Sequence, residues 1–240
     1  MKKLLTTIAC SLVAFTGFAN PPLNSGHTHL SAPKEDLEIK IYRQAETIPL
    51  LPLLNTWVVN SFGPFPYLYA PREDQIVSVT DFVFANEKNS LVLVARKGDR
   101  VVGVATGIAL DSFYLSKYFE PELISTMKDK DYDPSEYFYV AYFVLAPEFR
   151  GDLSIVEPIY DALAQFAKGI GKTHLTYIDI QRGENHPLRP AIFSSPEPWG
   201  TVITGVAAMD LYTCQTWPTF QTDGSIVDQE HTLQFFRKSL

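Results

Sequence analysis

The stretch Tyr139-Val140-Ala141-Tyr142-Phe143-Val144-Leu145-Ala146-Pro147-Glu148-Phe149-Arg150-Gly151 decides how this chain folds, because a long apolar strand in it runs directly into a tight loop. Pro147 ends the strand, and Arg150-Gly151 leads into the start of an amphipathic helix. Such a junction points backbone N–H groups and the positive end of a helix at one spot, where a phosphate group can bind. The sequence therefore favours nucleotide or coenzyme binding as the first functional hypothesis.

The elements around this loop predict a βαβ unit. The helix is expected over residues 154–168, where Ser154 followed by Glu157 is typical of a capping box. A second apolar strand follows at 174–180. A crossover helix joins parallel strands, so we expect the strand over 136–146 and the strand over 174–180 to be parallel neighbours in one sheet.

Outside this unit the spacing of apolar residues predicts an α/β domain. Helices are expected over 48–60 and over 75–86, although the second range is ambiguous with a strand, and residues 111–127 are helical or irregular. Gly103 and Gly107 lie inside a predicted strand, where they indicate a bulge or a close approach of another group. Strands are expected over residues 37–42, 91–95, 100–110, 207–213 and 231–236, with turns at 97–99 and 223–224.

The composition is that of a globular, acidic chain. Its 240 residues suit one domain, or one domain with a small extension. Hydrophobic residues make up 46% of the chain and charged residues 20%, which disfavours disorder. Because 20 Lys and Arg face 27 Asp and Glu, nucleic acid is not an expected partner, whereas a positively charged substrate would be attracted.

The N-terminal residues 1–19 are typical of a secretory signal peptide. Lys2 and Lys3 precede a short apolar run over 4–15, and Gly17-Phe18-Ala19 offers small residues to a signal peptidase. The apolar run is too short for a permanent transmembrane helix. We therefore expect an exported protein, periplasmic or secreted, with no stable membrane insertion after cleavage. A cytoplasmic protein is the alternative if the signal is not used or not cleaved.

Cleavage after Ala19 would leave a flexible leader over residues 20–36 and one folded domain over 37–240. If Cys10 leaves with the signal, Cys214 is the one remaining thiol and no intrachain disulfide can form. The fold then depends on its hydrophobic core.

Four segments, together with the order of the elements, resemble the GCN5-related N-acetyltransferase superfamily over roughly residues 37–240. Residues 144–151 resemble the strand and "Pro-x-x-Arg-Gly" start of the family's acetyl-CoA motif, and residues 101–107 resemble a strand of its hairpin. Residues 167–171, leading into 175–180, resemble its helix-Gly-strand step, and Trp217-Pro218-Thr219 is similar to a subset of bacterial members. The resemblance implies a mixed, mostly antiparallel twisted sheet with a central parallel splayed strand pair and flanking helices.

The resemblance also implies that acetyl-CoA is the co-substrate. The residues it assigns to coenzyme binding are Val144, Leu145, Arg150, Gly151, Asp152, Leu153, Ser154, Ile155 and, near the pantetheine arm, Asn185. The family continues as Arg-Gly-x-Gly-x-Gly, but here Leu153 and Ile155 replace two glycines and Asp152 adds a negative charge. Their Cβ atoms narrow the approach to the backbone. No metal is expected, because the five His are dispersed and Cys residues do not cluster.

Acetyl transfer to an amine needs a neutral nucleophile, a polarised thioester carbonyl and a proton for the departing thiolate. The resemblance implies that a backbone N–H midway along the long strand, from Tyr142 or a neighbour, steadies the oxyanion. Glu136 is the candidate base, with a solvated strand-end carboxylate as the alternative. Tyr142 and Tyr212 are candidate proton donors, with packed aromatic residues as the alternative. The period of two would place Glu136, Phe138, Val140, Tyr142 and Val144 on one face.

Two further polar groups are candidates near the second parallel strand. Asp179 could orient a substrate amine, or it could pair with Arg182. His186 could shuttle protons near neutral pH, or it could order the loop before Pro187.

The function that these observations favour is N-acetyl transfer from acetyl-CoA to a small-molecule or peptide amine. The alternative is an exported module that keeps the fold for binding and has lost catalysis. A hydrolase is disfavoured, because no nucleophile elbow is present. The acceptor and the oligomeric state are not predicted.

Overall fold

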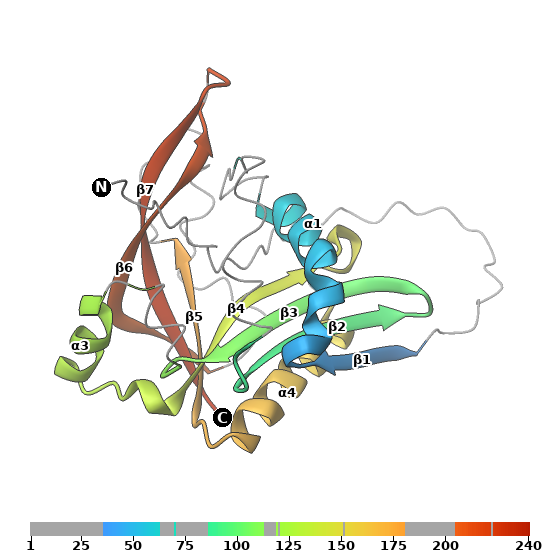
Figure 1. Ribbon diagram of the computed structural model, residues 1–240, viewed down its shortest axis with the longest axis horizontal. Helices are drawn as coiled ribbons and strands as arrows, with labels where there is room; N and C mark the ends of the chain where they lie inside the picture. Colours follow the sequence, from blue (N-terminus) through green and yellow to red (C-terminus); the bar gives the residue numbers. More distant parts are fainter. Residues whose placement is uncertain are drawn as a thin grey trace.

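The computed structural model describes residues 36–62, 70, 86–112, 119, 121–150, 152–180, 205–221 and 223–240. A seven-stranded sheet in the order β1-β2-β3-β4-β5-β7-β6 runs through the domain (Figure 1). The strands are β1 (Leu37–Tyr42), β2 (Ser90–Lys97), β3 (Arg100–Ala109), β4 (Tyr137–Leu145), β5 (His174–Ile180), β6 (Val206–Phe220) and β7 (Ile226–Ser239). The helices are α1 (Leu51–Phe62), α3 (Pro121–Asp129) and α4 (Leu153–Gly169), with 3-10 segments η1 (Gln44–Leu50), η4 (Pro134–Glu136) and η5 (Pro147–Phe149).

One pair of neighbouring strands in this sheet is parallel. β4 and β5 run in the same direction, and the other neighbours pair antiparallel. α4 crosses from the end of β4 to the start of β5, as expected for a parallel connection. The predicted βαβ unit is therefore confirmed, and so is the α/β fold class with a mixed, mostly antiparallel sheet and flanking helices.

The parallel pair separates soon after it begins. β4 pairs with β5 only from Tyr137 with His174 to Tyr139 with Thr176. β4 continues to Leu145 and β5 to Ile180, and Figure 1 shows the two strands diverging from their common start. The sheet therefore contains a fork, whose two arms are the second half of β4 and the second half of β5.

A bulge lies in β4 just past the start of this fork. Gly107 of β3 is paired with Val140, whereas Thr106 is paired with Tyr142, so Ala141 is the extra residue. Before the bulge Phe138 and Val140 pack on the α4 side, whereas after it Tyr142 packs on the opposite side. The expectation that Phe138, Val140, Tyr142 and Val144 share one face is therefore wrong, because one inserted residue reverses the alternation.

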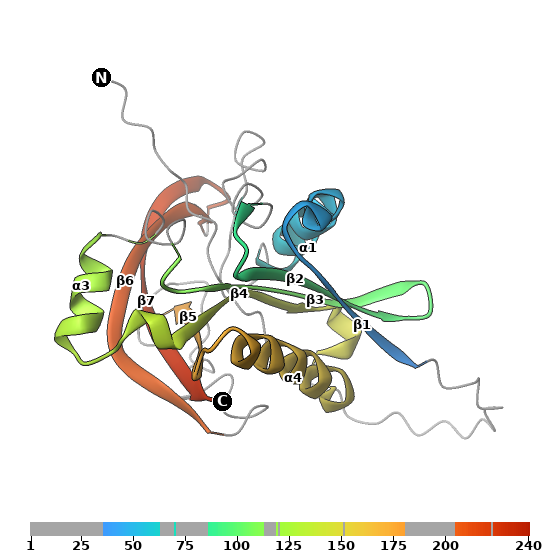
Figure 2. The same ribbon diagram turned by 60° about the horizontal axis from the view of Figure 1, so that its bottom comes forward.

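Two hydrophobic layers cover the two faces of the sheet (Figure 2). α4 lies on one face, and α1 and α3 pack on the other. The buried stripe of α4 includes Ile155, Ile159 and Leu163, which are at most 1% exposed. Burial of such side chains stabilises a fold by about 1.5–3 kcal/mol each. No helix in the described ranges has the length and hydrophobicity that crossing a bilayer requires.

Several element boundaries differ from those predicted. α4 is capped by Asp152, whose carboxylate accepts a hydrogen bond from the Ser154 N–H, so the expected capping box of Ser154 and Glu157 is wrong. Both patterns fit the local sequence, and the structure uses the earlier cap. Glu136 belongs to η4 and precedes β4. The two last strands are much longer than predicted, and residues 75–85 lie outside the described part of the chain.

The glycines of β3 are needed because neighbouring side chains occupy the space above them. A Cβ atom on Gly107 would lie 2.7 Å from Cζ of Phe138, and one on Gly103 would lie 2.8 Å from Cδ2 of Leu145 and 2.9 Å from Cδ1 of Ile159. Both contacts are shorter than carbon atoms tolerate. The predicted close approach at both glycines is therefore confirmed, as is a bulge next to Gly107.

We expect Gly107→Ala to lower the free energy of unfolding by about 1–3 kcal/mol, because the added methyl group must displace the Phe138 ring. Gly169→Ala is the matched control, since a Cβ there meets nothing within 4 Å and a helix prefers Ala. Urea denaturation of the two variants measures the difference. Equal stability of the variants would contradict the packing described for β3 and β4.

Candidate functional site

The fork places backbone groups of β4 where β5 no longer reaches them. The Ala146 N–H donates to the Val102 carbonyl at 3.0 Å, so Ala146 points toward β3. By the alternation of strand backbone groups, Val144 and Tyr142 also point toward β3, and Phe143 and Leu145 point into the fork. The backbone groups on this edge of β4 therefore face the fork and not β3.

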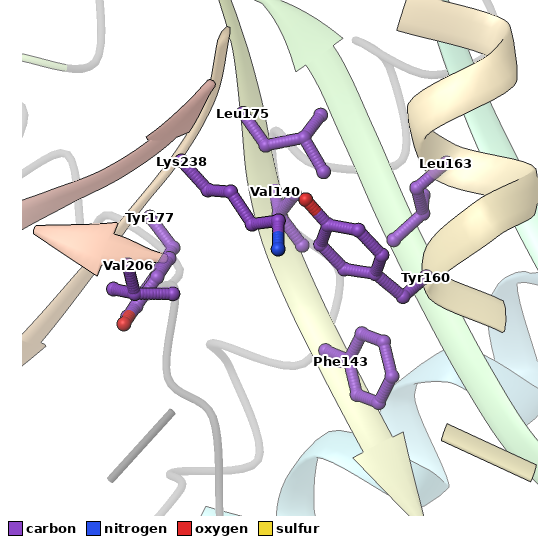
Figure 3. Close-up of a pocket in the computed structure, with 8 residues that line it drawn as sticks. All are labelled: Val140, Phe143, Tyr160, Leu163, Leu175, Tyr177, Val206 and Lys238. Carbon is purple, nitrogen blue, oxygen red and sulfur yellow. The ribbon is translucent and has the colours of Figure 1, made fainter. Parts of the chain in front are cut away.

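A narrow cleft of about 10 Å³, the space of roughly one water molecule, lies in this fork on the α4 side of the sheet. Figure 3 shows its walls, which come from five elements. The lining residues are Val140 and Phe143 of β4, Tyr160 and Leu163 of α4, Leu175 and Tyr177 of β5, Val206 of β6 and Lys238 of β7. The surface that these residues expose to the cleft is apolar.

One polar group at the cleft, the hydroxyl of Tyr160, lacks a hydrogen-bond partner among the described residues. The hydroxyl oxygen is buried. In Figure 3 the side chain extends from α4 and the hydroxyl points into the cleft. Buried hydroxyl groups normally find a partner, so this one is available to a bound ligand.

The surroundings of Tyr160 keep its hydroxyl protonated at neutral pH. Burial, and then the negative charge of Asp161, raise the pKa of the Tyr160 phenol. Lys238 places its Nζ atom 5.2 Å from the centre of the ring, where a cation is attracted to the aromatic face. A phenol in this setting can donate a proton, and the nearby cation would stabilise the phenolate that results.

The structure separates Tyr142 from the cleft. Its side chain is 3% exposed and packs in the layer beneath α1 and α3, on the face opposite α4. Its N–H donates to Oγ1 of Thr106 at 3.1 Å. Neither group of Tyr142 therefore points into the cleft, and the bulge at Ala141 is the reason.

The other two predicted catalytic residues also lie outside the lining. Glu136 is exposed and precedes the paired part of β4, at the end of the strand away from the fork. Burial and the charge of Arg237 lower the pKa of His174, and the carboxylate of Glu136 opposes this shift. Tyr212 lies on the edge strand β6, is 41% exposed, and accepts a long hydrogen bond from Gln234 at 3.4 Å.

Asp179 is the predicted residue that best fits the fork. It lies on β5 beyond the paired part and is 8% exposed. Leu175 and Tyr177 line the cleft on the α4 side, and the period of two places Asp179 on that side as well. A buried carboxylate here can hold a cationic group.

The loop before α4 has its own internal contacts. Oδ1 of Asp152 accepts hydrogen bonds from the N–H of Ser154 at 2.9 Å and from its hydroxyl at 2.6 Å. Ile155 is fully buried in the core, and Leu153 is 46% exposed. Leu153 and Ile155, which replace the expected glycines, therefore do not occupy the space at the helix N-terminus. The carboxylate of Asp152 occupies it.

Arg150 sits half-buried at the end of the same loop. Burial lowers the pKa of its guanidinium group, which means that a nearby anion would stabilise it. Of the other predicted coenzyme-binding residues, Val144 and Leu145 are buried in β4, and only Leu145 directs its backbone into the fork. Gly151 and Asn185 lie outside the described residues.

None of the eight lining residues was among the site residues predicted from the sequence, and Tyr160 and Lys238 are the two whose polar groups matter most for the chemistry. A possible signal for Tyr160 is its position next to Ile159, on the flank of the buried stripe of α4. Nothing in the sequence near Lys238 marks it, because β7 reaches the cleft only through the sheet order. Within the described ranges, no three His, Cys, Asp or Glu side chains are grouped as metal ligands.

Comparison of the sequence with family models and with curated proteins gives no match. The fold is similar to those of several solved acetyltransferases. A ribosomal-protein-alanine N-acetyltransferase from Brucella melitensis is 15% identical, with 84% of this chain and 99% of that chain covered and a TM-score of 0.47. An IAA acetyltransferase from Bacillus cereus is 13% identical, with 85% and 100% covered and a TM-score of 0.46.

A third similar structure, yncA from Salmonella typhimurium, was solved with its cofactor acetyl-CoA. It is 13% identical, with 85% of this chain and 94% of that chain covered and a TM-score of 0.45. Each of these likenesses is a likeness of fold at low identity, and none of them assigns a reaction to this chain.

We expect Thr106→Val to lower the free energy of unfolding by about 1–3 kcal/mol, because it leaves the buried N–H of Tyr142 without its acceptor. Thr106→Ser keeps the hydroxyl group and serves as the control. Chemical denaturation compares the two. If the valine variant is as stable as the serine variant, the hydrogen bond does not hold the bulge.

Proposed function

We propose that this chain is an N-acetyltransferase that moves an acetyl group from acetyl-CoA to an amine. The observation that carries the proposal is the fork between β4 and β5, which opens onto a cleft containing the partnerless hydroxyl of Tyr160. The strand-and-loop resemblance in residues 144–151 supports a coenzyme thioester as the donor. The acidic balance of the chain, 27 acidic against 20 basic residues, favours a cationic amine as the acceptor.

In this proposal the thioester lies along the fork with its acetyl group near Phe143. A backbone N–H of β4 that is directed into the fork donates a hydrogen bond to the carbonyl oxygen as negative charge develops on it. The apolar lining excludes water, which strengthens that hydrogen bond and protects the thioester from hydrolysis.

The cationic amine first loses a proton to solvent. Its neutral nitrogen then attacks the carbonyl carbon, a C–N bond forms, and the C–S bond breaks. Asp179 holds the amine and accepts the proton that the nitrogen loses. The departing thiolate takes the proton of Tyr160, and Lys238 stabilises the phenolate until solvent returns the proton. The products are an N-acetylated amine and a free thiol, so atoms and charge balance.

A second candidate function is binding without catalysis. Two observations favour it: the Tyr142 N–H is already used by Thr106, and the α4 N-terminus is already capped by Asp152. The signal-like residues 1–19 also support export, to a compartment where acetyl-CoA is not expected.

The two candidates differ in their response to acetyl-CoA. We expect millimolar acetyl-CoA to raise the melting temperature of the purified protein, because a bound ligand stabilises the folded state. We also expect a panel of primary amines and polyamines to cause release of free thiol, measured with a thiol-reactive dye. Stabilisation without thiol release would favour the binding module, and the absence of both would exclude acetyl-CoA as the donor.

We expect Tyr160→Phe to lower kcat for acetyl-CoA by about 10²-fold or more, because the thiolate then departs without a proton donor. The loss should nearly disappear with 4-nitrophenyl acetate, whose leaving group departs without protonation. Tyr132→Phe, which removes a phenol outside the cleft, is the control. An equal loss with both donors would show that Tyr160 has a structural role only.

A further inference from the structure

The N-terminus of α4 already holds an anion that belongs to the chain. The carboxylate of Asp152 accepts two hydrogen bonds from Ser154, one from its N–H at 2.9 Å and one from its hydroxyl at 2.6 Å. The N–H groups of Ile155 and Val156 each donate to the Asp152 carbonyl at 3.0 Å. The bond from Val156 is the first regular bond of the helix, so Asp152 satisfies two amides that lack a regular helical partner, those of Ser154 and Ile155.

These amides are the donors that a phosphate group would need at this helix. Helix N-termini bind phosphate because their first N–H groups lack internal partners and the helix dipole favours negative charge. Here the carboxylate satisfies the first donor and places its own charge at the same point. A diphosphate would have to displace that carboxylate or bind beside it against repulsion.

Other side chains leave this position accessible, so the charge is the main obstacle. Ile155 turns into the core, and Leu153 extends into solvent with 46% of its surface exposed. Arg150 is half-buried on the other side of the loop and supplies one positive charge. On η5, the charge of Glu148 is neutralised by an ion pair with Arg100.

We propose that Asp152 determines donor specificity: its carboxylate takes the place of a donor diphosphate at the start of α4. The carboxylate then weakens the binding of acetyl-CoA and leaves the binding of thioesters without a diphosphate unchanged. This inference rests on the proposed acetyl transfer and deepens it by naming the class of donor. The thioester end of the donor still binds in the fork, and the difference between donors lies at the far end of the thiol.

The test compares two donors in two proteins. Acetyl-CoA carries a diphosphate, and S-acetyl-N-acetylcysteamine has the same thioester without one. Asp152→Asn removes the charge and keeps a good helix cap, because Asn and Asp cap equally well. We expect the variant to show a KM for acetyl-CoA lower by about tenfold, since one unit charge close to a phosphate has roughly that effect. The KM for S-acetyl-N-acetylcysteamine should not change.

Two controls separate this effect from a general one. Asp228→Asn on β7 removes the same charge from an exposed position on another element and should change neither KM. The decrease in the KM for acetyl-CoA that Asp152→Asn causes should also become smaller as the salt concentration rises, because salt screens exposed charges. If Asp152→Asn fails to fold, Asp152→Ser supplies an uncharged cap for the same comparison.

The outcomes distinguish this inference from the proposed function. Equal changes for both donors, or no change for either, would overturn the role of Asp152 while leaving acetyl transfer intact. If no protein transfers acetyl groups from either donor, the proposed function fails. In that case CoA binding, measured by thermal stabilisation, still decides the inference: tighter binding to Asp152→Asn supports it, and unchanged binding rejects it.

Discussion

Ala141 is one residue more than the pairing of β3 with β4 can accommodate, and the geometry of the cleft follows from it. Because the strand must absorb this residue, Phe138 and Val140 face α4 while Tyr142 faces α1 and α3. The bulge lies where β4 loses β5 as a partner, so the turn of the backbone and the opening of the fork coincide. Gly107 opposite the bulge leaves room for the Phe138 ring, and Thr106 holds the Tyr142 N–H.

The polar chemistry of the cleft comes from elements that are far apart in the chain. Tyr160 belongs to α4 and Lys238 to β7, and both line the cleft. Asp179 of β5 is outside the lining, and the alternation of the strand places it on the same face of the sheet. A partnerless phenol beside a cation is a costly arrangement in an apolar setting unless a ligand completes it. At the start of α4, by contrast, the donor groups of Ser154 already have a partner, because the Asp152 carboxylate accepts their hydrogen bonds without any ligand. The fork therefore contains a hydroxyl group that a ligand could satisfy, whereas the N–H donors at the helix N-terminus already have a partner.

The sequence was sufficient where local pattern determines structure. β1 and β5 have the predicted bounds, since short alternating or apolar runs flanked by polar residues leave few alternatives. The site was harder to predict. The roles of Glu136 and Tyr142 follow from the family resemblance, and their shared face follows from strict alternation, which a single inserted residue invalidates. The sequence also favours Ser154 as the cap, although Asp152 fits the same pattern. Tyr160 and Lys238 become neighbours only through the packing of α4 on the sheet, which no local pattern encodes.

The position of β7 between β5 and β6 has a consequence for how the protein is made. β7 is the last of these strands in chain order, yet β6 is joined to the rest of the sheet through it. During synthesis β6 leaves the ribosome before β7, so it stays unpaired until β7 has emerged. Because β5 and β7 residues that pair are more than fifty positions apart, closing this part of the sheet is a slow, late step. The cleft wall that carries Lys238 therefore forms last, and the nascent chain has no complete cleft until that strand has left the ribosome.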